Sequence, residues 1–249
     1  YNPEQLSMFK WYVLFIGNFY YQNHPWNGSP MDPLWSISVE EQFYLIFPML
    51  MGILGLIWVP RLGIGFTVVS IAALIIESLL HVSGNAIWTN TLSEFIFFGA
   101  GILCSVYTIK NQVKIKPLTR VFFLLTAFVI FVCSTYFAFM EPLDDSSNVL
   151  MVVGYVGAAI GCVLVLFSFL NTEVEFPKFI LFLGKISYGL YVWHMLNIYI
   201  LGHFFKHTTL LKPLTIFPTI AMAVISYRYL ETPFLRLKSK FTYIRNRPA

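Results

Sequence analysis

The chain has 249 residues, of which 57% are hydrophobic and 11% are charged, and its formal net charge is +4. A soluble domain has about a quarter of its residues charged, so this composition excludes an ordinary soluble fold and favours a polytopic membrane protein. The positive charge comes largely from short loops and the C-terminal tail, so we expect no nucleic acid as a partner.

Apolar runs predict an all-α fold, a polytopic transmembrane helical bundle of about eight helices. In chain order the runs cover residues 6–20, 35–59, 63–80, 92–108, 120–140, 149–170, 180–204 and 213–231. Several of them approach the ~20 residues that a helix needs to cross a bilayer. The first run is the weakest, because it is short and is interrupted by Lys10 and Asn18.

Lysine and arginine residues are distributed unevenly among the loops. The loop around residues 109–120 has four of them and the C-terminal tail has five, whereas loops 21–34, 81–91 and 141–148 have none. The positive-inside rule therefore predicts that loop 109–120 and the C-terminus are cytoplasmic.

The stretch 35–48 is unusual, because it carries two adjacent carboxylates inside an apolar run. A carboxylate at membrane depth is costly, so Glu40 and Glu41 are expected to face a protein interior or a watery cavity. At helical spacing Ser36, Glu40 and Tyr44 lie on one face. The pattern predicts the wall of a pocket.

A capping box is the alternative interpretation, in which Ser38 and Glu41 satisfy backbone donors at the start of a helix. Asp32 and Pro33 compete for that role, since Asp is a good N-cap and Pro suits the first helical position. A helix that starts at Asp32 places Glu40 about 12 Å along its axis, past any cap. The spacing favours the pocket, and the cap stays open as an alternative.

A second concentration of polar residues lies in the stretch 182–194. Ser187, Tyr191 and His194 follow helical spacing and share one face. We expect this face to line the same cavity as the two carboxylates of the earlier stretch, because both put polar groups at membrane depth. The alternative is a histidine that only forms a hydrogen bond with a neighbouring helix.

Polar residues elsewhere in the apolar runs have ordinary explanations. Glu77 and His81 are four residues apart at a predicted helix end, where a pair that snorkels to water is expected. Glu94 is expected in a first turn, where the helix dipole favours a carboxylate. Near the end of the last run, Arg228 and Glu231 predict an intrahelical ion pair, and Pro233 predicts a stop.

The three cysteines lie in separate apolar runs, too far apart in sequence for a metal-ligand motif. They are expected to be small buried hydrophobes. No metal site is therefore predicted.

Three stretches resemble a known family. Residues 34–45 (LWSISVEEQFYL) resemble the signature of the acyltransferase-3 family of integral membrane acyltransferases. Residues 182–194 and 227–233 resemble two later stretches of the same family, and all three occur in the family's order. The resemblance covers most of the chain.

The resemblance implies an acyltransferase that moves an acyl group, usually acetyl, from acyl-coenzyme A to a hydroxyl of a cell-envelope saccharide, lipid-linked saccharide or similar acceptor. It implies a protein integral to the lipid bilayer of the bacterial inner membrane, with acyl-CoA as donor substrate and no bound cofactor. The implied catalytic residues are Glu40, Glu41 and His194. The implied substrate-binding residues are Trp35, Ser36, Ser38, Gln42, Tyr44, Tyr188 and Glu231.

The N-terminal part of the chain departs from the family. Members have an Arg-Gly helix that bears the histidine taken as catalytic base, followed by an arginine-rich cytoplasmic motif. Nothing before Lys10 is basic, and the first histidine, His24, is in a predicted loop. We expect one acyltransferase-3-like membrane domain over residues 1–249 that is incomplete at its N-terminus. The alternatives are a degenerate member, a structural subunit, or a non-catalytic protein that binds or moves a lipid-linked saccharide.

Cysteine labelling in intact cells tests the predicted orientation. A cysteine in place of Lys114 should be protected from an impermeant reagent added outside, because a loop rich in Lys and Arg stays in the cytoplasm. A cysteine in place of Asp144 should be labelled. The reverse pattern would contradict the predicted topology.

Overall fold

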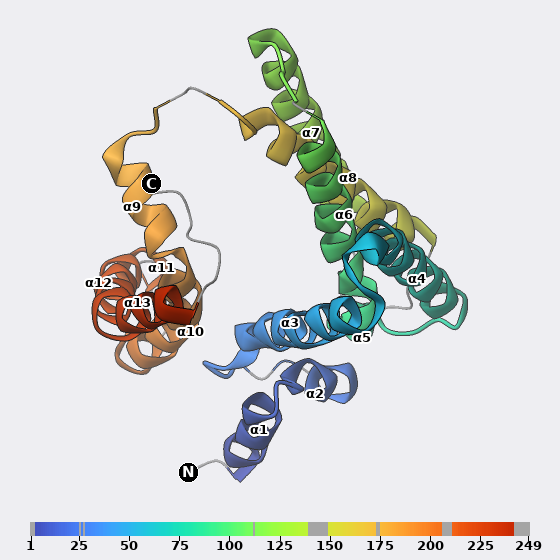
Figure 1. Cartoon of the computed structure of the whole chain (residues 1–249). Helices are drawn as coiled ribbons and strands as arrows, with labels where there is room; N and C mark the ends of the chain where they lie inside the picture. Colours follow the sequence, from blue (N-terminus) through green and yellow to red (C-terminus); the bar gives the residue numbers. More distant parts are fainter. Residues whose placement is uncertain are drawn as a thin grey trace. The chain divides into compact units, whose positions relative to one another are not determined.

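Helices build the described part of this chain, in the computed structural model shown in Figure 1. The structure describes residues 3–24, 26, 28–111, 113–138, 149–172, 175–205 and 211–241, and none of these forms a β-strand. The predicted all-α class is confirmed. The predicted outer loop 141–148 and the end of the basic tail lie outside the described residues.

The chain divides into two compact units, each of which is described by itself. The first unit comprises Tyr1–Pro25 and Trp35–Glu173. Its elements are α1 (Pro3–Val13), α2 (Gly17–Asn23), α3 (Trp35–Leu54), the 3₁₀ turn η2 (Leu56–Trp58), α4 (Val59–Leu79), α5 (Gly84–Trp88), α6 (Thr91–Lys110), α7 (Pro117–Ala138) and α8 (Val149–Phe169).

The second unit comprises Trp26–Leu34 and Val174–Ala249. Helices α10 and α12 pack against each other in it. Its elements are the 3₁₀ turn η1 (Asp32–Leu34), α9 (Lys178–Lys185), α10 (Ser187–Phe204), α11 (Leu211–Leu214), α12 (Ile216–Ser226), the π-helical turn η3 (Tyr227–Glu231) and α13 (Thr232–Phe241).

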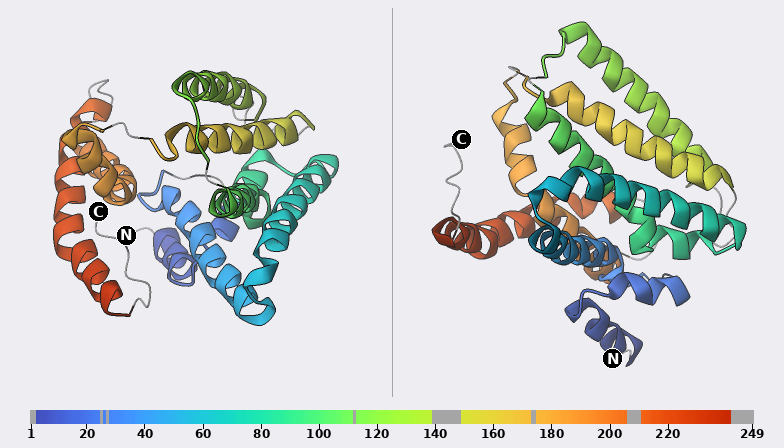
Figure 2. Two further views of the ribbon diagram at one scale, coloured as in Figure 1. Left: turned by 45° about the horizontal axis from the view of Figure 1, so that its top comes forward. Right: turned by 45° about the vertical axis from the view of Figure 1, so that its right-hand side comes forward.

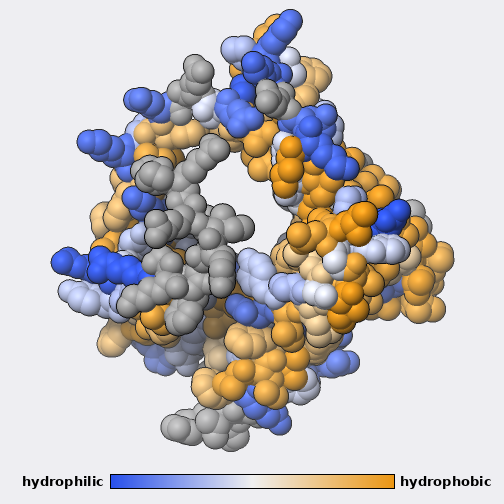
Figure 3. Space-filling model, viewed as in Figure 1, coloured by the Kyte–Doolittle hydropathy of each residue, from blue (hydrophilic) through white to orange (hydrophobic). Residues whose placement is uncertain are grey.

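Five helical segments among the described residues are long and apolar enough to cross a membrane. A sixth results if α9 and α10, which meet at a bend of 66°, are one span. Hydrophobic atoms dominate the surface over α4 in the view of Figure 3, as expected of a side that faces lipid. The protein is thus a polytopic membrane protein. The five segments are Asp32–Leu54, Leu56–Leu79, Gly84–Lys110, Pro117–Tyr136 and Leu150–Phe169.

The first predicted helix, over residues 6–20, is interrupted in the structure. Phe15 adopts a positive φ of 54° and separates α1 from α2. A Cβ added at Gly17 would lie 2.6 Å from the ring of Tyr12, so the chain can turn this closely only at a glycine. Periodicity alone did not reveal this break, because both helices are apolar enough to read as one run.

The end of the last predicted helix also differs, since Pro233 does not stop it. Pro233 is the second residue of α13, where a missing backbone N–H costs little. The π-helical turn η3 comes directly before it, and the Thr232 hydroxyl donates to the carbonyl of Tyr227 at 2.7 Å. The turn and the hydroxyl together let the helix continue to Phe241.

Glycines allow two pairs of helices in the first unit to approach closely. A Cβ at Gly99 of α6 would lie 2.5 Å from the hydroxyl of Thr67 on α4. On α8, a Cβ at Gly161 would lie 2.8 Å from the ring of Phe131, and one at Gly157 would lie 2.6 Å from Ser134 Oγ. Helices α7 and α8 run side by side in Figures 1 and 2. Small residues at these contacts are the usual device for packing helices within a bilayer.

A buried apolar cluster joins the two pairs, α4 with α6 and α7 with α8. Members of the cluster come from α4, α5, α6 and α8, and their side chains are almost fully buried. The cluster lies toward the ends of these helices near α5. The six members are Leu74, Ile87, Ile96, Met151, Tyr155 and Ala159.

The cysteines only partly follow the prediction of three buried side chains. Cys104 is buried, whereas Cys133 and Cys162 are exposed. Both exposed cysteines lie on apolar helices that are long enough to span a membrane. A small, weakly polar thiol is tolerated on such a surface, so burial was the wrong expectation for two of the three.

Replacing Gly99 tests the close contact of α4 with α6. In Gly99→Ala the new Cβ would lie 2.8 Å from the backbone nitrogen of Thr67, so the helices must separate. We expect a loss of about 1–3 kcal/mol in stability, measured as a lower unfolding temperature in detergent. The control is Gly101→Ala on the same helix, where nothing lies within 4 Å of the added Cβ. Equal unfolding temperatures for the two variants would refute the close contact.

Candidate active site

Helix α3 contains nearly all of the signature segment, residues 34–45, and aromatic rings hold one of its sides in place. The ring of Phe43 stacks on Phe98 of α6, with centroids 4.2 Å apart. It also meets the edge of Phe66 on α4, at 5.8 Å. Trp35, at the start of α3, lies 6.1 Å from Trp88 of α5. These contacts fix the rotation of α3 against α4, α5 and α6.

Gln42 is the polar anchor of the same helix. Its Nε2 donates to the carbonyl of Phe15 at 2.7 Å and to Asn18 Oδ1 at 2.9 Å. Its Oε1 accepts from the hydroxyl of Thr91 at 2.5 Å. Asn18 Nδ2 in turn donates to Thr91 Oγ1 at 2.9 Å and to the carbonyl of Thr89 at 3.0 Å. We call Asn18, Gln42, Thr89 and Thr91 the amide network.

The amide network links α2, α3 and the start of α6 through buried groups. Asn18 and Thr89 are fully buried, and Thr91 is 6% exposed. In an apolar environment a satisfied set of amides and hydroxyls is held firmly, because breaking one bond leaves its partner buried and unpaired. Gln42 was expected to bind substrate, and the structure gives its side chain this anchoring role between helices.

Ser38 decides between the two interpretations of the signature start. Its side chain is 2% exposed, and its Oγ accepts a hydrogen bond from the backbone N–H of Gly17 at 3.2 Å. Helix α3 begins at Trp35, so Ser38 already lies inside the helix. The capping-box interpretation with Glu41 is therefore wrong, and Ser38 joins α3 to α2.

Glu40, Glu41 and Tyr44 form the carboxylate face of α3. Glu40 is exposed, Glu41 is half-buried and Tyr44 is 57% exposed. Glu40 precedes Gln42 by two residues, which is about 200° around a helix, so it lies on the side away from the amide network. Within the described part of the chain no hydrogen bond or ion pair involves either carboxylate. The polar neighbour expected for one of them on another helix stays a prediction.

The second motif lies on α9 and α10. Ser187 Oγ donates to the carbonyl of Gly184 at 2.9 Å. The Tyr191 hydroxyl donates to the carbonyl of Pro33 in the same unit. His194 forms a hydrogen bond through Nδ1 with the carbonyl of Tyr191, and their rings lie 5.7 Å apart. Helix α10 thus carries these polar side chains on one face. That this face and the carboxylate face line one cavity stays a prediction.

Asn197 is a polar residue of α10 that the sequence analysis did not single out. It is buried, and its Nδ2 donates to the hydroxyl of Thr219 on α12 at 3.2 Å. Gly189 supports this contact, because a Cβ there would lie 3.0 Å from the backbone of Ala223. An asparagine inside an apolar run is the signal that could have found this link.

Glu231 does not form the predicted ion pair with Arg228. No salt bridge joins the two within the described residues, and the Arg228 guanidinium lies 5.7 Å from the ring centroid of Tyr229. Both residues belong to the π-helical turn η3, whose wider spacing removes the three-residue alignment of an α-helix. Glu231 Oε1 is enclosed and has no hydrogen-bond partner among the described residues. A substrate-binding role for Glu231 stays a prediction, as it does for Tyr188.

Two other carboxylates have partners that the sequence analysis missed. Glu77 of α4 accepts hydrogen bonds from the Asn90 amide and, at 2.7 Å, from the Ser93 hydroxyl. Glu94 of α6 accepts from the buried hydroxyl of Tyr155 on α8 at 3.3 Å. Glu77 is thus anchored by hydrogen bonds within the protein, whereas the sequence had predicted that it extends to water together with His81. The signal was the cluster of polar residues at the start of α6.

The amide network predicts a specific loss of stability. Gln42→Leu removes three hydrogen bonds and leaves buried partners unsatisfied, so we expect a loss of about 2–3 kcal/mol. Thermal unfolding in detergent measures it. The control is Glu41→Gln, next to it on α3, which should change stability by less than ~0.5 kcal/mol. Equal losses in the two variants would show that Gln42 is no anchor.

The chain matches the model of the acyltransferase-3 family, described as an acyltransferase domain, over residues 3–228. It is 28% identical over 249 residues to the "Putative peptidoglycan O-acetyltransferase YrhL" of Bacillus subtilis, covering 91% of this chain and 38% of that protein. It is 24% identical over 241 residues to the "O-acetyltransferase OatA" of Staphylococcus aureus, covering 89% and 40%. No solved structure matches.

A further relative is a "Putative O-acetyltransferase" of Staphylococcus aureus strain COL, 23% identical over 237 residues, which cover 90% of this chain. The chain spans about two fifths of the length of the curated relatives it matches. The family match runs through both units and includes the first two motifs in full and the first two residues, 227 and 228, of the third. The chain therefore belongs to the acyltransferase-3 family of integral membrane acyltransferases.

Proposed function

We propose that the protein is a membrane O-acyltransferase that moves an acyl group, acetyl by analogy with its relatives, from acyl-CoA to a hydroxyl of a cell-envelope saccharide. The names of the relatives as O-acetyltransferases support the reaction class. The relative from Bacillus subtilis, named for peptidoglycan, supports a saccharide of the envelope as acceptor. The family match over most of the chain supports extending the reaction class and the type of acceptor to this protein.

The two sides of α3 carry the proposal. The side chains of Ser38 and Gln42 form hydrogen bonds that hold the helix in place. Glu40 and Glu41 form no hydrogen bonds among the described residues. Leaving two carboxylates without partners on an apolar helix is costly in a bilayer. Such a cost is usual where a side chain has a task beyond folding, so the carboxylate face is the best candidate for contact with substrate.

A carboxylate suits the acceptor half of the reaction. It accepts a hydrogen bond from a sugar hydroxyl, which orients the oxygen toward the acyl carbon and draws its proton away as the new ester bond forms. The thioester sulfur leaves with the electrons of the broken carbon–sulfur bond. His194 is the other candidate catalytic residue of the motifs, and its imidazole is the kind of group that serves as a general acid or base. Trp35, Ser36 and Tyr44 are proposed to position the acceptor.

Removing the carboxylates tests this function in the full-length protein. Glu40→Ala and Glu41→Ala should each lower acylation of the envelope saccharides by about 100-fold or more, since general acid–base groups contribute 10²–10⁴ in rate. Mass analysis of the saccharides measures acylation, and the amount of protein in the membrane is measured alongside. The control is Glu175→Ala, which removes an exposed carboxylate ahead of α9. Acylation that persists when both Glu40 and Glu41 are replaced would show that the two carboxylates are structural and would overturn their proposed catalytic role.

A further inference from the structure

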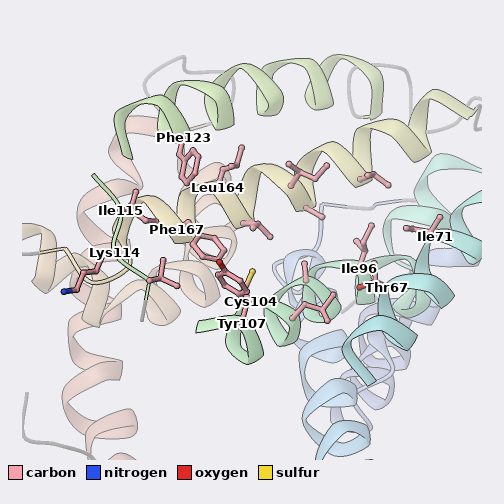
Figure 4. Close-up of a pocket in the computed structure, with 17 residues that line it drawn as sticks. Thr67, Ile71, Ile96, Cys104, Tyr107, Lys114, Ile115, Phe123, Leu164 and Phe167 are labelled. Carbon is pink, nitrogen blue, oxygen red and sulfur yellow. The ribbon is translucent and has the colours of Figure 1, made fainter. Parts of the chain in front are cut away.

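An apolar groove of about 770 Å³ lies in the first unit, between the helix pair α4/α6 and the pair α7/α8 (Figure 4). It is within the size range of sites that take small molecules or lipids. Aliphatic and aromatic side chains make up most of its wall. The hydroxyl of Thr67, one of its few polar groups, is already bonded to the carbonyl of Gly63.

The inner end of the groove is closed by the apolar cluster of the first unit. Ile96 and Ala159 belong to that cluster and also line the groove. Ile71 and Val156 pack against the cluster and line the groove as well. Apart from the Thr67 hydroxyl, which is already bonded, the lining residues of this end are apolar and offer no group that could bind a headgroup or a nucleotide.

The other end of the groove carries a positive charge. Lys114 lies at this end in Figure 4, with its nitrogen pointing away from the apolar wall, and it is exposed. No aspartate or glutamate occurs between Phe95 and Ala138, whereas Lys110, Lys116 and Arg120 all occur in the same loop region. An anion at this end would therefore be attracted by the cationic side chains of this loop.

The loop that carries Lys114 is held in place by hydrogen bonds. Arg120 Nε donates to the carbonyl of Ile115 at 3.1 Å, and Asn171 Nδ2 donates to the carbonyl of Val113 at 3.2 Å. Arg120 Nη1 also donates to the carbonyl of Ser168 at 2.7 Å, at the end of α8. The two neighbours of Lys114 are thus anchored, and both line the groove.

The length of the groove matches one leaflet of a bilayer. Along α6 the lining residues run from Ile96 to Tyr107, and along α8 from Val156 to Phe167. Eleven helical steps cover about 16 Å at ~1.5 Å per residue. Half of the hydrocarbon core is about 15 Å thick. A chain that starts at the level of Lys114 would reach the closed end near the middle of the membrane.

We propose that this groove binds one acyl chain of an anionic phospholipid, with the lipid phosphate at Lys114. The apolar wall takes the chain, the anchored lysine takes the phosphate, and the lipid fills the space between the two helix pairs. An acetyl donor does not need a groove of this length, and its nucleotide would need polar groups that the wall lacks. The site is independent of the carboxylate face of α3.

Native mass spectrometry of the full-length protein in detergent tests the site. Titration with phosphatidylglycerol should reveal one lipid that binds on the order of tenfold more tightly than phosphatidylcholine with the same chains, because only the former carries a net negative charge. Lys114→Glu should weaken the binding of phosphatidylglycerol on the order of tenfold. The matched control is Lys178→Glu, which changes an exposed lysine of α9 outside the groove. This variant should bind phosphatidylglycerol as tightly as the wild type does.

A second pair of variants tests the apolar wall. Val163→Trp fills the groove and should abolish tight binding of the lipid. Val153→Trp changes an exposed position of α8 outside the groove and should retain tight binding. The lipid should raise the unfolding temperature of the wild type and of Val153→Trp but not of Val163→Trp. Equal binding of phosphatidylcholine, unchanged binding in Lys114→Glu, or preferential binding of palmitoyl-coenzyme A would each overturn the proposal.

Discussion

The hydrogen bonds of Gln42 are the constraint on which the first unit depends. A glutamine amide in an apolar helix must be satisfied on both its oxygen and its nitrogen, because no water is at hand in a bilayer to replace a missing partner. Asn18 and Thr91 meet this need from α2 and α6, and the Phe15 carbonyl becomes available where the chain turns between α1 and α2. One side chain thereby sets the positions of three helices.

The rotation of α3 follows from this anchor. With Gln42 and Ser38 turned toward α2 and α6, a helix of 3.6 residues per turn must turn Glu40 to the opposite side. The signature therefore combines two tasks in twelve residues: one side holds the helix, and the other presents carboxylates. This division explains why an amide directly follows two carboxylates within one motif.

Close packing elsewhere relies on shape more than on polar bonds. Gly99 brings α6 against α4, and Gly157 and Gly161 bring α8 against α7. The two pairs meet at the cluster that includes Leu74 and Tyr155, and the groove lies between them beyond it. A bilayer lipid can stabilise such a gap because its chain supplies the dispersion contacts that the helices do not make.

The sequence by itself determined the membrane class, the family and the helix that bears Glu40 and Glu41. Composition, run length and a contiguous motif are local properties, so they can be read without a structure. Only the tertiary structure decided that Ser38 and Gln42 anchor α3, that Glu77 bonds to α6, and that Arg228 and Glu231 do not pair. The partners of Gln42 lie 24, 27 and 49 residues away, and contacts between helices depend on packing geometry that no hydrophobic period records.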